Sequence, residues 1–272
     1  MKIIEKRVRS ILNRTKIPGV DYVVNPYVGC QHNCVYCYAR YVRRFIGEDS
    51  EWGDFVYVKV NGPELAERNS RGKCGKVAFS TVCDAYQPLE SKYKITRGIL
   101  ENLNPRLELG ILTKSPLVLR DIDVLKRYDD VEIGLSIMTL DEDVRRCFEL
   151  NSPSVESRID ALRKIHEEGI RTFVFIAPIM PYLTDMEEIM KELSPYVDFF
   201  QFEDLNLSPV KKQVLEVIDE NFGDDLLLKY KNLPKNFWDE KIEEIIRLGK
   251  KYDKPVKIFF KRLNYFHYSD SK

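Results

Sequence analysis

The sequence of 272 residues lacks an excess of either charge, a long hydrophobic run and a Gly/Ser-rich linker. Lysine plus arginine and aspartate plus glutamate both number 43, which excludes a strongly basic DNA-coating protein but not local basic patches. The most apolar stretch, Phe173 to Met180, is shorter than the ~20 residues needed to cross a bilayer, and the charged N-terminal segment lacks the apolar core of a signal peptide. We therefore expect a cytoplasmic protein without a membrane partner.

The composition is that of a folded protein with little cysteine. Hydrophobic residues make up 44% and charged residues 32%, enough for a core and against disorder, and the length fits one large domain. Three of the six cysteines lie in one short motif. This distribution favours metal binding in a reducing compartment over a disulfide framework.

The motif is C-x3-C-x2-C, formed by Cys30, Cys34 and Cys37. Three thiolates on one loop can hold three irons of a [4Fe–4S] cluster. The fourth iron is then free to bind the amino and carboxylate groups of S-adenosylmethionine (SAM), whose reductive cleavage gives a 5′-deoxyadenosyl radical. The spacing therefore predicts an open cluster.

Two other sites use the same cysteines. With His32 they could form a Cys3His zinc site, although a histidine between two of the cysteines is poorly placed to share their metal. With Cys74 or Cys83 they could form a closed electron-transfer cluster. Either site would make a non-catalytic metal protein.

Short β-rich runs alternate with amphipathic segments along the chain. This alternation predicts a parallel sheet with right-handed crossovers and a ligand site at the carboxyl ends of its strands. One helix should start at Ser152 as N-cap with Pro153 at its first position and stop at Gly169. An extra strand or hairpin is expected at Phe55–Val60, and a late strand at Pro255–Phe260. The strands expected in the sheet are Tyr22–Val24, Val77–Val82, Leu107–Thr113, Val131–Met138, Thr172–Pro178 and Val197–Glu203.

Six segments in order from about Ser10 to about Asp204 resemble the radical SAM proteins related to spore photolyase. The resemblance implies a partial (β/α)6 TIM-type barrel, the open [4Fe–4S] cluster, SAM and an external flavodoxin- or ferredoxin-type reductant. It also implies a core over residues 1–205 and a short α/β extension over 206–272 that completes or caps the barrel. The segments are Asp21–Arg40, Thr81–Glu90, Thr113–Asp121, Leu135–Thr139, Asn151–Ser154 with Arg158, and Ala177–Pro181.

The same resemblance implies four SAM-binding residues. Tyr36 would lie near the adenine, with its side chain equally able to pack the loop. Asp84 would receive the ammonium directly or through a neighbouring carbonyl, or would close an Asx-type turn. Lys114, at a strand end, would pair with the carboxylate rather than face solvent. Ser136 would contact the ribose or carboxylate, or simply pack inside the barrel.

In spore photolyase a cysteine at the end of the second strand returns a hydrogen atom to the substrate. This chain has Thr81 there, and Cys83 follows two residues later on the same strand face. Cys83 is thus a candidate hydrogen donor, with packing in the core as the alternative. The substrate stays open among DNA, RNA, peptide and small molecules.

Two further groups have a functional and a structural interpretation. Glu149 and Arg158 could form a polar pair at the barrel mouth, on the substrate side or as a structural ion pair. The basic and aromatic tail from Phe259 to Tyr268 could stack bases or cap the barrel, and its capping is favoured because the chain has no wider basic excess.

Overall fold

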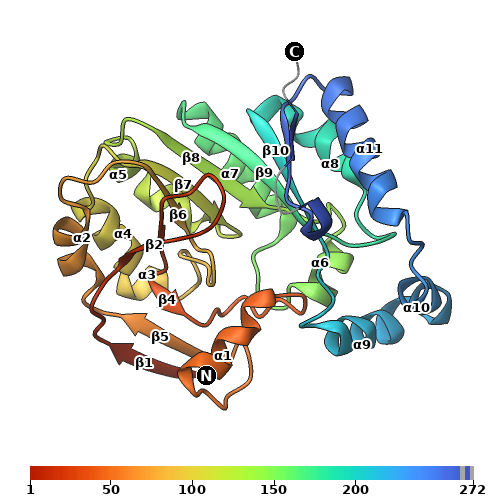
Figure 1. Ribbon diagram of the computed structural model, residues 1–272, viewed down its shortest axis with the longest axis horizontal. Helices are drawn as coiled ribbons and strands as arrows, with labels where there is room; N and C mark the ends of the chain where they lie inside the picture. Colours follow the sequence, from red (N-terminus) through yellow and green to blue (C-terminus); the bar gives the residue numbers. More distant parts are fainter. Residues whose placement is uncertain (264–266, 270–272) are drawn as a thin grey trace.

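The computed structural model describes residues 1–263 and 267–269, which form two sheets with helices around the larger one (Figure 1). The larger sheet has nine strands, in the order β12-β11-β10-β9-β8-β7-β6-β3-β2. Neighbours from β3 to β11 pair in parallel, while β2 and β12 pair antiparallel at the two open edges. The strands are β2 (Leu12–Arg14), β3 (Tyr22–Val24), β6 (Lys76–Phe79), β7 (Glu108–Thr113), β8 (Val131–Ser136), β9 (Arg171–Ile179), β10 (Phe199–Asp204), β11 (Val256–Ile258) and β12 (His267–Ser269).

This open parallel sheet confirms the expected fold class, a partial barrel of the TIM type. The six expected core strands are all present in chain order, from β3 to β10. The late strand also exists, as β11, and it extends the parallel run because Phe200 pairs with Val256. Strand β6 ends earlier than expected, since Ser80 has a φ of +72° and turns the chain out of the sheet.

The expected strand at Phe55–Val60 is β5 (Phe55–Lys59), and it belongs to the second sheet. It pairs in parallel with β1 (Lys2–Lys6) and antiparallel with β4 (Tyr27–Val28). The sequence pattern did not predict β1, whose residues are largely exposed. The second sheet lies beside the cysteine motif, because β4 leads directly into it.

Helices cover the outer face of the large sheet (Figure 1). Buried side chains between the two layers include Ile133 and Leu135 of β8 and Leu162 and Ile165 of α7. The covering helices are α2 (Gly62–Ser70), α4 (Ile95–Asn102), α5 (Ile122–Leu125), α7 (Val155–Glu167), α8 (Met186–Leu193) and α11 (Phe237–Lys251).

The predicted start of α7 is wrong by two residues. Its N-cap is Ser154, whose hydroxyl accepts a hydrogen bond from the Ser157 amide at 3.2 Å. Ser152 instead lies in the preceding turn, where its amide donates to the Glu149 carbonyl at 3.1 Å. The predicted stop at Gly169 is confirmed, since this glycine follows the helix with a φ of +74°.

The C-terminal part contributes to both the sheet and the helical layer. Helices α9 (Lys211–Phe222) and α10 (Asp224–Lys231) pack on each other, and α9 also contacts α6 (Glu142–Phe148).

In the tail, Phe260 is buried against Trp238 with ring centroids 5.4 Å apart, which supports capping, and Lys261 is exposed as expected. Residues 264–266 of the tail lie outside the described residues, and the boundary between residues 205 and 206 stays a prediction. No helix of the described part is both long and apolar enough to cross a membrane.

Candidate functional site

The cysteine loop (residues 29–37) lies at the carboxyl edge of the parallel strands, where ligand sites of such sheets occur. It begins with Gly29, which has a φ of +89° and where a Cβ would lie 2.4 Å from the Phe55 carbonyl oxygen. Cys30 and Cys34 are buried, Cys37 is half-buried, and all three are free thiols. The loop therefore brings three sulfurs together within the protein.

Burial controls the protonation of these thiols. Burial, and then the charge of Asp84 and the neighbouring sulfurs, raise the pKa of Cys30 well above its usual value. Burial, and then Cys34, raise the pKa of Cys37 to about 12. Burial also raises the pKa of Cys34. Thiols of this kind stay protonated until a metal displaces the protons. Clustered, buried sulfur donors are the ligand set that iron–sulfur clusters and zinc prefer, so the residues fit the implied cluster.

His32 faces away from the zinc site that it could have completed. Its Nε2 lies 3.2 Å from Asp84 Oδ2, and its Nδ1 lies 3.5 Å from the Asn151 carbonyl oxygen. Among the described residues, no three His, Cys, Asp or Glu side chains are gathered around a single metal ion. A cubane cluster does not need such a gathering, because each of its thiolates binds a separate iron.

The other cysteines lie apart from the loop to different degrees. Cys74 is exposed in the turn before β6, at the amino edge of the sheet and thus opposite the cysteine loop. Cys147 lies on α6. Cys83 is half-buried at the carboxyl edge, with its Sγ 3.8 Å from Asn25 Oδ1, and it packs against the main core. Burial raises the pKa of Cys83 to about 12.

Asp84 is fully engaged by protein groups. Its carboxylate accepts hydrogen bonds from the Tyr86 amide at 2.8 Å, the Thr113 hydroxyl at 2.7 Å and the Lys114 amide at 2.8 Å. The first of these is the Asx-type turn considered above. Burial alone would raise the pKa of Asp84, but His32 and these donors lower it to about 2. Asp84 therefore fixes the ends of β6 and β7 next to the cysteine loop.

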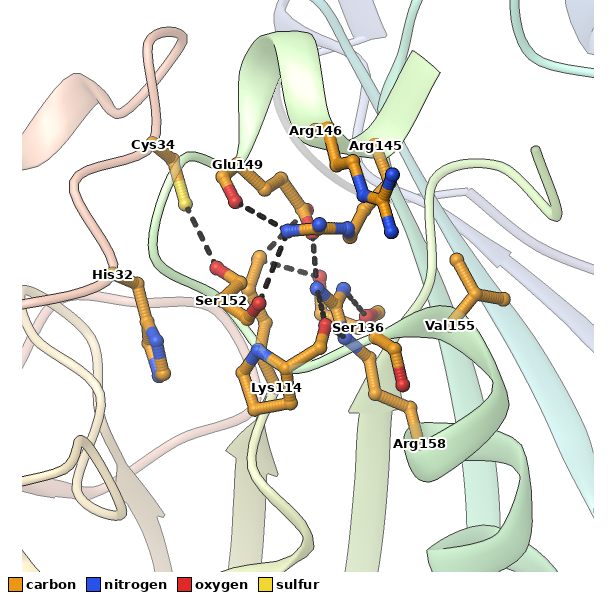
Figure 2. A network of polar contacts seen from close by, with 12 residues as sticks. His32, Cys34, Lys114, Ser136, Arg145, Arg146, Glu149, Ser152, Val155 and Arg158 are labelled. Atoms are coloured by element: carbon orange, nitrogen blue, oxygen red, sulfur yellow. Dashed lines mark hydrogen bonds and ion pairs between the residues drawn. The ribbon is translucent and has the colours of Figure 1, made fainter. Parts of the chain in front are cut away.

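Four of the residues singled out from the sequence meet beside the ends of β7 and β8 (Figure 2). Lys114 Nζ donates to Ser136 Oγ at 2.8 Å and lies 3.6 Å from Glu149 Oε1. The expected pair of Glu149 and Arg158 is confirmed as a buried ion pair. Burial disfavours the charged Glu149, but Arg158 and Lys114 outweigh it and lower its pKa to about 2.

Tyr36 joins this network through its side chain. Its hydroxyl donates to Glu149, and Lys114 Nζ lies 5.7 Å from the centroid of its ring. The network thus connects the cysteine loop to β7 and β8 through Lys114 and Ser136. It places one ammonium group, 14% exposed, beside the buried sulfur of Cys34.

Two residues at this edge of the sheet escaped the sequence analysis. Gln87, fully buried, donates to the Gly29 carbonyl at 3.2 Å and accepts from the Gln31 amide at 3.0 Å, so it holds the start of the cysteine loop. Glu203 lies at the end of β10, where burial and then Asp204 raise its pKa to about 7. Gln87 belongs to the segment 81–90 that resembles the family, but nothing in the sequence pairs it with the loop. Glu203 carried a weak signal, as an acid at the end of an expected strand.

Comparisons with known proteins agree with this architecture. The pattern of the Radical SAM superfamily matches residues 24–193. An uncharacterized protein of Methanocaldococcus jannaschii is 41% identical over 258 residues, which cover 94% of this chain and 96% of the relative. An uncharacterized protein of Acidianus two-tailed virus is 28% identical over 259 residues, which cover 90% of this chain and 80% of the relative.

Solved structures share the fold at low sequence identity. A cysteine-to-serine mutant of spore photoproduct lyase has a TM-score of 0.72 at 16% identity, over 95% of this chain and 82% of that one. The lyase complexed with dinucleoside spore photoproduct has a TM-score of 0.71 at 16% identity over the same shares, 95% and 82%. Since the superfamily pattern spans most of the chain and a relative is 41% identical along nearly all of it, the protein belongs to the radical SAM superfamily, with a spore-photolyase-like fold.

Proposed function

We propose that this protein is a radical SAM enzyme in which Cys30, Cys34 and Cys37 hold one [4Fe–4S] cluster and leave its fourth iron open to SAM. The observation that carries the proposal is the set of three clustered thiols, two buried and one half-buried, beside the ammonium group of Lys114 at the carboxyl edge of a parallel sheet. When bound, these cofactors supply a one-electron cleavage of SAM whose 5′-deoxyadenosyl radical abstracts a hydrogen atom.

The chain's own residues would bind and orient SAM. Lys114 offers a partly desolvated cation for the carboxylate, and Ser136 and Glu149 hold its Nζ in place. The side chain of Tyr36 is tied to Glu149, which favours a backbone contact with the adenine. The carboxylate of Asp84 is occupied by three protein donors, which favours an ammonium contact through a neighbouring carbonyl over a direct one.

Cys83 is the proposed hydrogen donor to the substrate radical. It is half-buried at the same edge of the sheet as the cysteine loop. Its packing against the core supports the structural alternative equally well. A Cys83→Ala variant that still forms 5′-deoxyadenosine but no longer forms product would support donation, whereas unchanged product formation would support packing.

The partners follow from this chemistry. The enzyme needs a one-electron reductant of the flavodoxin or ferredoxin type. We expect the enzyme and its reductant to act in the cytoplasm. A nucleic acid is a reasonable first substrate class, because a structure with this fold holds a dinucleoside photoproduct. The balance of 43 basic and 43 acidic residues favours a substrate recognised locally over one held along its backbone.

The test is anaerobic reconstitution with iron and sulfide, followed by dithionite, SAM and mass spectrometry for 5′-deoxyadenosine and methionine. Cys30→Ala, Cys34→Ala and Cys37→Ala should each abolish 5′-deoxyadenosine, and Cys74→Ala should not. Deuterium transferred into 5′-deoxyadenosine from labelled nucleic acid, peptide or small-molecule pools would identify the substrate class. A zinc protein would instead lack the broad cluster absorption at roughly 400 nm.

A further inference from the structure

The cysteine loop is bound along one side by a turn that includes the first two residues of the family-like segment Asn151–Ser154. This support turn (residues 149–152) follows α6, and Glu149 forms a β-bridge with Cys34. The Val35 amide donates to the Phe148 carbonyl at 2.8 Å, and the Asn151 amide donates to the His32 carbonyl at 3.1 Å. The support turn and the last residue of α6 therefore pair with the loop through backbone hydrogen bonds on both sides of Cys34.

The last residue of the support turn contacts the sulfur of Cys34. Ser152 Oγ lies 3.8 Å from Cys34 Sγ, within hydrogen-bond distance for sulfur, and both residues are buried (Figure 2). A thiolate that binds iron has no proton to give. With the cluster bound, only the hydroxyl can be the donor in this contact.

A buried arginine keeps Ser152 at this distance. Arg145 of α6 donates through one nitrogen to the Glu149 carbonyl at 2.7 Å and to the Ser152 carbonyl at 3.0 Å. Its other nitrogens donate to Glu142 at 3.1 and 2.8 Å. The other oxygen of Glu142 accepts from the Val155 amide at 3.1 Å. The turn is thus held from α6 and from the start of α7, so it is preorganised before any ligand binds.

We propose that Ser152 is a positioning residue for the cluster, whose hydroxyl donates a hydrogen bond to the Cys34 ligand and raises the reduction potential of the cluster. A donor at a ligand sulfur withdraws electron density from the iron and stabilises the reduced state. The enzyme would then accept its electron from a weaker reductant. This inference rests on the proposed function, because it needs the cluster.

The experiment compares the midpoint potential of the reconstituted cluster, by redox titration followed by electron paramagnetic resonance (EPR), in matched variants. Ser152→Thr keeps a hydroxyl. Ser152→Val has the shape of the threonine variant but lacks the hydroxyl. We expect a lower potential in Ser152→Val and Ser152→Ala, and the wild-type potential in Ser152→Thr. Ser157→Ala is the control, since it removes a nearby hydroxyl that donates only to the Ser154 carbonyl, at 2.8 Å.

Equal potentials in Ser152→Thr and Ser152→Val, with full iron content, would overturn the proposal. Loss of iron from both variants would overturn it too, because packing rather than the hydroxyl would then support the loop. Loss of iron from Ser152→Val alone would support it. A wild-type protein that reconstitutes no cluster would instead contradict the proposed function itself, so the two failures are distinguishable.

Discussion

Glu149 and Arg158 form an ion pair in which neither side chain is more than 1% exposed. The same carboxylate accepts the Tyr36 hydroxyl and lies 3.6 Å from Lys114 Nζ. A buried charge is tolerated only when it is paired and hydrogen-bonded, and here one carboxylate satisfies groups from the cysteine loop, β7 and α7. This carboxylate therefore joins the cysteine loop to Lys114 and to α7.

Removing one partner of this pair should destabilise the fold. Arg158→Met leaves Glu149 buried without its main partner, and we expect the free energy of unfolding of the cluster-free protein to fall by about 3–5 kcal/mol. The double variant Glu149→Gln, Arg158→Met should recover part of the loss. Denaturant unfolding measures both. A loss below about 1 kcal/mol in the single variant would mean that Lys114 alone compensates the carboxylate.

The pair also predicts a loss of stability in acid. The pKa of Glu149 is about 2 in the folded protein and 4.5 ordinarily, so the folded state favours its charged form. Its contribution is present above pH 4.5 and disappears as the pH falls towards 2. The advantage of the wild type over Glu149→Gln in unfolding free energy should therefore shrink over that range. An advantage that stays constant from pH 5 to pH 2.5 would contradict this assignment.

The contribution of Glu203 to stability should depend on pH in the opposite direction. Its pKa is about 7 instead of 4.5, so the folded state favours the neutral acid. Its stability contribution is full below pH 4.5 and is lost as the pH rises through 7. The free energy of unfolding of Glu203→Gln, relative to that of the wild type, should thus rise by about 1–3 kcal/mol between pH 4.5 and pH 8. Both are measured on the cluster-free protein. Glu220→Gln on the exposed side of α9 controls for the loss of one carboxylate. No gain at pH 8 would show that Glu203 is well solvated.

Lys114 should determine the affinity for SAM without affecting the cluster. Lys114→Met removes the cation proposed for the SAM carboxylate, and we expect affinity to fall about 10- to 100-fold with iron content unchanged. Equilibrium dialysis of the reconstituted protein with labelled SAM gives the affinity. Lys126→Met, an exposed lysine paired with Glu168, is the control. Unchanged affinity would remove Lys114 from the cofactor site.

The number of cysteine ligands can be counted directly. Cys74→Ala and Cys83→Ala should each retain the full iron and sulfide content of the wild type, whereas Cys34→Ala should lose most of it. Cys74 lies at the opposite edge of the sheet, and Cys83 Sγ contacts Asn25. Loss of iron from Cys83→Ala would indicate a closed, four-cysteine cluster.

The sequence predicted the parts of the fold that repeat. Alternating strands and helices predicted the parallel sheet, and the family resemblance together with the strand ends pointed to Lys114 and Ser136, which meet because β7 and β8 are neighbours. Local signals were less reliable where tertiary contacts intervene. Ser152 has good N-cap chemistry, but its backbone is bound by Glu149 and Arg145, and Ser154 caps the helix instead.

Contacts between distant segments were beyond the sequence. Gln87 holds a loop that is 58 positions away, and the pairing of β1 with β5 has no periodic signature. The sequence allows His32 to be a metal ligand. In the fold its imidazole instead contacts Asp84, which lies in the segment after β6. Such pairings follow from the packed fold and not from local propensity.

The most direct test of the account is the EPR spectrum of the reduced, reconstituted protein before and after addition of SAM. SAM that binds the open iron should change the spectrum, and 5′-deoxyadenosine should then form. A spectrum that SAM leaves unchanged in protein with full iron content would show that no iron is open, and would contradict the proposed chemistry.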